Sequence, residues 1–226
     1  MTKLRVGGLI IDREHALADA RSYLTSGSGW AYPSYDSYEA QRAHGPLTDA
    51  DLLAPLLLNV NQLKIRTYEA LQAVRGTLDE VLIRIPVDLD LADASPEDLL
   101  LIGELFSVLD SPGVWGAQGT VLAKVLHRKR PRFIPLYDEQ VRAVYQGGDN
   151  APVTPRPKGG RSWRKFMVLF ATAIQADLRR EADFWQQIVD LAPGPKITLL
   201  RGLDIVAWQA GRPLQTADPS TTADAP

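Results

Sequence analysis

The chain has 226 residues, of which 45% are hydrophobic and 23% charged, values typical of a globular protein with a sizeable core. It contains no cysteine, which excludes disulfides, thiol catalysis and cysteine-ligated zinc or iron–sulfur centres, and three scattered histidines argue against a histidine-rich metal site. The net charge of −2 hides an asymmetry, because residues 124–165 hold eleven basic and three acidic residues and so carry +8. This segregation favours an anionic partner at one place.

The first part of the chain predicts a helix followed by an aromatic segment. Asp12 is placed to cap a helix over residues 12–24. Residues 29–38 include four aromatic side chains, which suit either a base-stacking platform or a clip that holds the first helix on the core. We favour the clip. Residues 6–11 and 83–85 are the short strand candidates, so no sizeable sheet is expected.

A long helical stretch is predicted over residues 49–75. Its start, Thr48-Asp49-Ala50-Asp51, resembles a capping box in which Asp replaces the usual Glu. We expect a bend at Pro55 or Asn59, and we expect Gly76 to end the helix.

Capped amphipathic helices dominate the remainder. Ser95 followed by Pro96 is a strong helix start, and the apolar helix that it opens belongs in the core. Further helices are predicted over residues 120–128, 138–146, 184–191 and 198–209, and from Ser162 onward. We predict an all-α fold with one core from about residue 10 to 211, a single domain over 1–211 with a mobile loop at 147–160, and a disordered tail over 212–226.

The segment from residue 113 onward has the features of a phosphate-binding site. Its turn is rich in glycine, which lets a ligand approach the backbone N–H groups, and a helix N-terminus follows. The alternative is a turn that needs glycine for packing. Basic side chains lie at the C-terminal end of that helix, where the helix dipole favours cations. Others lie at the N-terminal start of a later helix, where the dipole disfavours cations and a bound phosphate would offset that cost. The predicted nucleic-acid contacts are Gly113, Gly116, Gly119, Thr120, Lys124, Arg128, Lys129, Arg130, Arg161, Arg164 and Lys165. A solvated basic helix end is the alternative for the 127–130 cluster.

Asp138 fits two roles. It directly precedes a predicted helix, which is the favoured position of an N-cap. It also fits a catalytic carboxylate, whose charged form the helix N-terminus would favour. We favour the cap, because no second acid–base group is evident nearby in the sequence.

The order of these motifs resembles the helix-hairpin-helix DNA glycosylases. Pro112-Gly113-Val114, Gly116 and Thr120 match that family's hairpin, and Ile134-Pro135-Leu136-Tyr137-Asp138 matches its aspartate segment. The resemblance implies an all-α, two-lobed fold, with DNA in the cleft, the hairpin on phosphates and Asp138 as the catalytic carboxylate. Asp110-Ser111 and Trp115 interrupt the hairpin, and Gln118-Gly119 stands where lyase members carry a lysine, so the hairpin implies no Schiff-base chemistry.

Most of the chain is also similar to uncharacterised actinobacterial proteins of one domain family, which share segments like Leu-His-Arg-Lys-Arg-Pro and Ile-Pro-Leu-Tyr-Asp. That likeness implies no activity. Three functions stay open: a nucleic-acid-binding protein without glycosylase activity, a monofunctional DNA glycosylase that uses Asp138, and a module that binds an acidic protein. We expect the first, in the cytoplasm, with no signal peptide, metal, cofactor or membrane association.

Overall fold

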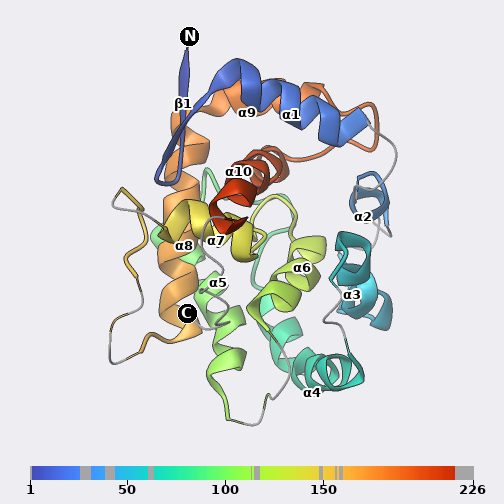
Figure 1. Ribbon diagram of the computed structural model, residues 1–226. Coiled ribbons are helices and arrows are strands. Elements are labelled where there is room, and N and C mark those ends of the chain that lie inside the picture. Colours follow the sequence, from blue (N-terminus) through green and yellow to red (C-terminus); the bar gives the residue numbers. More distant parts are fainter. Residues whose placement is uncertain are drawn as a thin grey trace.

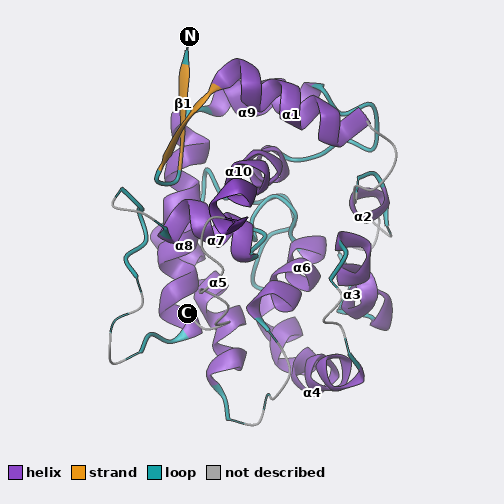
Figure 2. Ribbon diagram, in the orientation of Figure 1, coloured by secondary structure: helices purple, strands orange, loops and turns teal. Residues whose placement is uncertain are grey.

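The computed structural model describes residues 2–25, 32–38, 44–60, 64–112, 114, 118–147, 150–155, 157 and 160–216. The fold is all-α, as predicted, with one small hairpin at its N-terminal end (Figure 1, Figure 2). The helices are α1 (Arg13–Thr25), α2 (Ser34–Ser37), α3 (Asp49–Leu53), η2 (Ala54–Leu58), α4 (Ile65–Leu82), α5 (Pro96–Phe106), η3 (Ser107–Asp110), α6 (Gly119–Lys129), α7 (Glu139–Gln146), α8 (Trp163–Arg180), α9 (Ala182–Asp190) and α10 (Leu199–Thr216).

The hairpin pairs β1 (Lys3–Val6) with β2 (Leu9–Asp12) in antiparallel register. Its turn needs glycine, because Gly7 has a φ of 55° and a Cβ there would lie 2.5 Å from the Val144 carbonyl oxygen. The Gly7 N–H donates to Asp177 of α8, which fixes the turn against the helical body. Leu4 is fully buried, so the core begins earlier than the predicted residue 10.

The stretch over residues 49–82 confirms one prediction and corrects another. Thr48 and Asp51 form the predicted capping box, and the helix breaks at Asn59, which has a φ of 55°. The second helix, α4, then runs through Gly76 to Leu82, so the expected end at Gly76 is wrong. Glycine inside a helix costs only about 1 kcal/mol relative to alanine, and the burial of Leu71 and Leu78 on both sides outweighs that cost.

The predicted caps of three further helices are also present. Ser95 and Asp98 form a capping box at α5, Asp138 accepts from the third residue of α7, and Ser162 caps α8. The long helix α8 packs against α5, and Figure 1 shows it along one side of the molecule. Within the loop 147–160, the described Val153 is buried, so this part of the loop is packed on the body.

The last helix is longer than predicted. We expected a disordered tail from Arg212, but α10 continues through Pro213 to Thr216. Its last turns pack on α7, because Gly211 is so close to Gln140 that a Cβ would lie 2.1 Å from that residue's carbonyl oxygen. The rest of the predicted tail, residues 217–226, lies outside the described residues. Helix α10 also packs on α1 and α9, and Figure 1 shows it beneath these two helices.

One large hydrophobic cluster spans the chain from Leu4 to Ala207. A small second cluster joins Tyr35 of α2, Ala54 of η2 and Leu136. These contacts hold α2 and η2 beside α6 and the segment before α7, and the pocket described next lies along this junction.

Candidate binding pocket

A pocket of about 130 Å³ lies between α1, the end of η2, α6 and α10. Its charged lining residues are Lys124, Asp138, Arg201 and Asp204. The other lining residues are aromatic, apolar or amide side chains, namely Tyr23, Leu58, Asn59, Leu136, Ile205 and Trp208. Four charged side chains within so small a space, walled by rings and aliphatic groups, suit a small ligand with an apolar body and polar groups.

Asp138 is both a helix cap and a pocket residue. One carboxylate oxygen, Oδ1, accepts from the backbone N–H of Val141 at 3.0 Å, which confirms the predicted cap. The other oxygen, Oδ2, lies 3.6 Å from Nζ of Lys124, an interaction looser than a hydrogen bond. Asp138 and Lys124, both singled out from the sequence, therefore line one pocket. Oδ1 of Asp138 caps α7, whereas Oδ2 is only loosely engaged.

Arg201 organises the pocket floor. Its Nε lies 2.9 Å from Asp36 of α2, a second nitrogen donates to the Tyr23 hydroxyl at 3.0 Å, and the third bonds Asp204 one helical turn on. Burial lowers the pKa of this guanidinium, but the surrounding anions outweigh burial and hold the pKa well above its ordinary value. All three guanidinium nitrogens thus have partners on α1, α2 or α10, so Arg201 fixes the lining residues in place.

Asp204 is a second acid–base group in the same pocket. Burial raises its pKa from 3.8 to about 6, and the neighbouring Asp138 adds to the rise while Arg201 opposes it. Asp204 is therefore ionised at pH 7 and half protonated near pH 6. The expectation that Asp138 has no acid–base neighbour is wrong, because Asp204 is 66 positions away in the sequence but lines the same wall.

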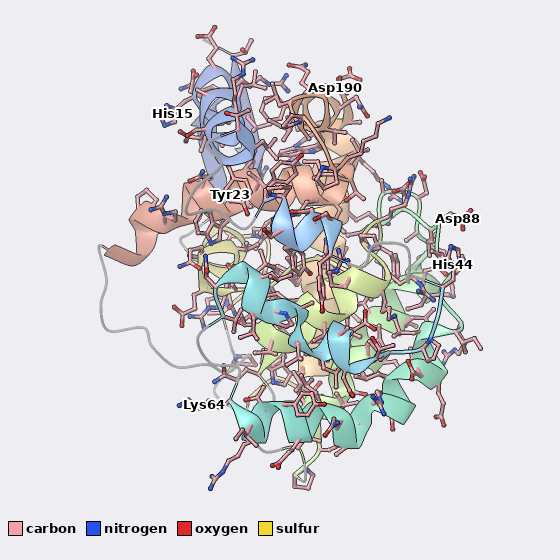
Figure 3. All side chains as sticks on the ribbon, turned by 90° about the vertical axis from the view of Figure 1, so that its right-hand side faces the viewer. His15, Tyr23, His44, Lys64, Asp88 and Asp190 are labelled. Atoms are coloured by element: carbon pink, nitrogen blue, oxygen red, sulfur yellow. The ribbon has the colours of Figure 1, made fainter. Side chains whose placement is uncertain are left out.

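Two aromatic side chains stand at the pocket. Tyr23 meets Trp208 edge to face, with ring centroids 6.1 Å apart. Figure 3 shows Tyr23 on the side of α1 that faces the helical body, whereas His15 of the same helix points outward. Trp208 is half-buried, and the exposed Arg212 lies over its ring at 5.0 Å from the centroid. The ring of Trp208 thus contacts Tyr23 and Arg212, and part of it reaches the surface.

The predicted basic cluster is buried, which overturns the expectation of an exposed helix end. The exposed fractions are 5% for Lys124, 8% for Arg128, 1% for Lys129 and 6% for Arg130. Lys129 pairs with Asp51 at 2.8 Å, and Arg128 lies over the ring of Tyr35. These side chains serve the packing of α6 against its neighbours, so three of the predicted phosphate contacts, Arg128, Lys129 and Arg130, are covered by protein.

Arg130 shows why a buried guanidinium is stable here. It donates to the carbonyl oxygens of Leu82 and Ile85 at 2.6 and 2.8 Å. These carbonyls lie at the C-terminal end of α4, where the helix leaves acceptors unsatisfied and its dipole favours a cation. His127 is also internal, because its Nδ1 bonds the Ile134 carbonyl and burial lowers its pKa to about 4. Neither residue is available as a surface group.

The predicted site at the start of α8 is occupied by a carboxylate of the chain itself. Asp110 accepts from the backbone N–H groups of Trp163 and Arg164, at 2.7 and 3.2 Å. Arg161 is held by the carbonyls of Thr154 and Pro155. An external phosphate is therefore not needed to offset the charges at this helix start, and only Arg164 and Lys165 of the predicted trio are exposed.

The glycine turn is only partly described. Gly113 and Gly116 lie outside the described residues. Gly119 supports the packing alternative, because a Cβ there would lie 2.2 Å from the ring of Trp163. Thr120 is partly buried in the first turn of α6.

Sequence reasoning missed Tyr23, Arg201, Asp204 and Trp208. The signal for two of them is visible, because Arg201 and Asp204 are three residues apart within the otherwise apolar run Leu199–Val206. Opposite charges at that spacing on a buried helix face indicate an internal ion pair. No sequence pattern links α1 to α10, so Tyr23 becomes a pocket residue only through the fold.

Comparisons with known proteins identify a family but assign no activity. Residues 16–211 match a protein-family model described as a family of unknown function. The comparison with curated proteins and the comparison with solved structures give no match. Within the described residues, no helix is long and apolar enough to cross a membrane, and no three metal-binding side chains gather.

Proposed function

The chain belongs to the family of unknown function DUF6308, and we propose that it binds nucleic acid by taking one unpaired base into the Asp138–Lys124 pocket. The observation that carries the proposal is the meeting, in this pocket, of two polar residues predicted from the sequence with the aromatic pair Tyr23 and Trp208. Rings that accept a base by stacking or edge contact, next to hydrogen-bonding groups for its edge, are how single-stranded nucleic acids are bound.

The size of the pocket suits one heterocyclic ring. A cavity of about 150 Å³ holds a benzene molecule, and this pocket measures about 130 Å³. Among its lining residues Asn59 is exposed and Trp208 is half-buried, so we expect a larger base to extend outward past them from the ring-sized interior. Contact between a base and an aromatic side chain contributes roughly 1–3 kcal/mol of binding free energy.

The backbone of the strand is expected to lie at the mouth. Arg212, beside Trp208, is an exposed cation at the rim, where phosphate contacts position a strand without reading its sequence. This replaces the predicted contacts from the buried basic cluster of α6. Few phosphate contacts imply a weak salt dependence, with a slope of log affinity against log salt of only about −0.7 per contact for single strands.

Retention of labelled single-stranded oligonucleotides by the full chain tests the proposal. Trp208→Ala should weaken binding by roughly five- to a hundredfold, because the ring contact is lost. Tyr68→Ala is the matched control, since it removes an aromatic ring from α4 that does not line the pocket. No retention by the wild type at low salt, or equal retention by both variants, refutes the proposal.

Hydrolysis of an N-glycosidic bond is the second candidate, and the position of Asp204 favours it. Asp204, whose pKa burial raises, lies in the same pocket as the Asp138 carboxylate, and such an environment is how enzymes keep one carboxyl group ready to act as an acid. The Asp138 carboxylate would stabilise positive charge on the sugar while the protonated fraction of Asp204 delivers a proton to the leaving base. Water would then form the new bond to the sugar carbon and return a proton to the Asp204 carboxylate. Release of free bases from a panel of damaged duplexes, lost in Asp138→Asn, tests this activity, and no release from any duplex excludes it for those substrates.

A further inference from the structure

Asp204 and Lys124 present an acceptor and a donor with spare capacity to the same pocket. The side chain of Asp204 accepts one hydrogen bond within the described part of the chain, from Arg201 to Oδ2, which leaves Oδ1 for a ligand. Lys124 is 95% buried, and among the described residues its ammonium has only the loose contact with Asp138, 3.6 Å away. A buried ammonium with three donors and a buried carboxylate oxygen both gain from a partner that completes their hydrogen bonds.

We infer that the pocket selects bases that carry an exocyclic amine next to a ring nitrogen, with Asp204 accepting from the amine and Lys124 donating to the ring nitrogen. This inference rests on the proposed function. Adenine and cytosine present that donor–acceptor pair. Hypoxanthine and uracil present the reverse pair, a carbonyl oxygen next to a ring N–H. The reversed edge places a carbonyl oxygen against a carboxylate and an N–H against an ammonium, so both contacts become unfavourable.

Neighbouring side chains position Asp204 and the backbone of Lys124. Arg201 binds Asp204 through Oδ2, and Arg201 is itself held by Asp36 and Tyr23, so a chain of hydrogen bonds positions the Asp204 carboxylate. Lys124 leaves α6 beside the buried hydroxyl of Tyr35, which donates to the Lys124 carbonyl at 2.7 Å and fixes the backbone there. An acceptor that is held in place before the ligand arrives increases affinity, because less side-chain entropy is lost on binding.

The test uses oligothymidine strands that differ in one central base, since thymine carries no exocyclic amine. Adenine is compared with hypoxanthine and cytosine with uracil, and affinities for the full chain are measured above pH 7, where Asp204, with a pKa of about 6, is ionised. The amine-bearing member of each pair should bind on the order of tenfold more tightly. Asp204→Asn should abolish the preference, because an amide presents either a donor or an acceptor.

A second variant protects the test against misfolding. If thermal melting shows that Asp204→Asn is unfolded, Lys124→Met carries the comparison, since it keeps the aliphatic stem and removes the donor. Retention of all four strands with equal affinity overturns the inference and leaves base binding intact. A preference that persists in the folded variants also overturns it. If no strand is retained, both the proposed function and this inference are refuted.

Discussion

The burial of the basic end of α6 predicts a large loss of stability in Asp51→Asn. Nζ of Lys129 lies 2.8 Å from Oδ2 of Asp51, and their side chains are 1% and 9% exposed. Asparagine keeps an oxygen for the capping box with Thr48 but leaves the lysine charge without its carboxylate. Removing one partner of a buried pair costs about 3–5 kcal/mol, which at about 2–4 °C per kcal/mol is a fall of roughly 6–20 °C in the melting temperature.

The assay is thermal unfolding followed by circular dichroism, with urea unfolding to give the free energy. Asp90→Asn is the matched control, because its partner Arg132 is half exposed and such a pair contributes at most about 1 kcal/mol. The double variant Asp51→Asn/Lys129→Met removes the buried charge as well and should recover most of the loss. If Asp51→Asn melts within the range of Asp90→Asn, Lys129 is solvated, and the argument that this cluster is unavailable to nucleic acid fails.

Substitutions at four further positions have expected outcomes. Asp138→Ala should unfold with a free energy about 1 kcal/mol lower than Asp138→Asn, measured in urea, because only asparagine keeps the cap. Both lose the carboxylate that faces the pocket, so equal values would show that the cap contributes nothing. The pKa of His127 is lowered from 6.5 to about 4 by burial. The unfolded chain therefore binds a proton between these values that the folded chain does not, and stability falls as the pH drops. This group should make the protein about 2 kcal/mol less stable at pH 5 than at pH 7, a difference absent in His127→Gln. An unchanged pH profile in the variant would place the ring in solvent. Gly119→Ala should destabilise by about 1–3 kcal/mol or more, since its Cβ would overlap an indole ring. Gly76→Ala should stabilise by about 0.5–1 kcal/mol, because nothing lies within 4 Å and the helix gains from alanine. The reverse order of melting temperatures would contradict the packing role of Gly119.

The sequence predicted local features well, because caps and periodicity act over a few residues. The capping box at Thr48 and the caps at Ser95, Asp138 and Ser162 are all present, and the chain turns at Asn59, one of the two positions where a bend was expected. The failures concern contacts between distant segments. Gly76 does not end its helix, because packing on both sides overrides a local propensity.

The prediction that the basic cluster of α6 lies at the surface is also wrong because of contacts between distant segments. Charge in a sequence suggests solvent, but the carbonyls of Leu82 and Ile85 and the carboxylate of Asp51 receive these side chains inside the fold. The candidate site was half predictable. Lys124 and Asp138 lie in one motif and were found, whereas Asp204 joins them from α10 through tertiary packing alone.

A crystal structure of the full chain with an oligothymidine strand that carries one central adenine would show directly whether the pocket takes a base. We expect the adenine ring to occupy the pocket against Trp208, with its amine within hydrogen-bond distance of Asp204 and Lys124 next to the ring nitrogen. We also expect the strand's phosphates to lie near Arg212. A strand bound instead along the start of α8, at Arg164 and Lys165, with the adenine outside the pocket, would contradict it.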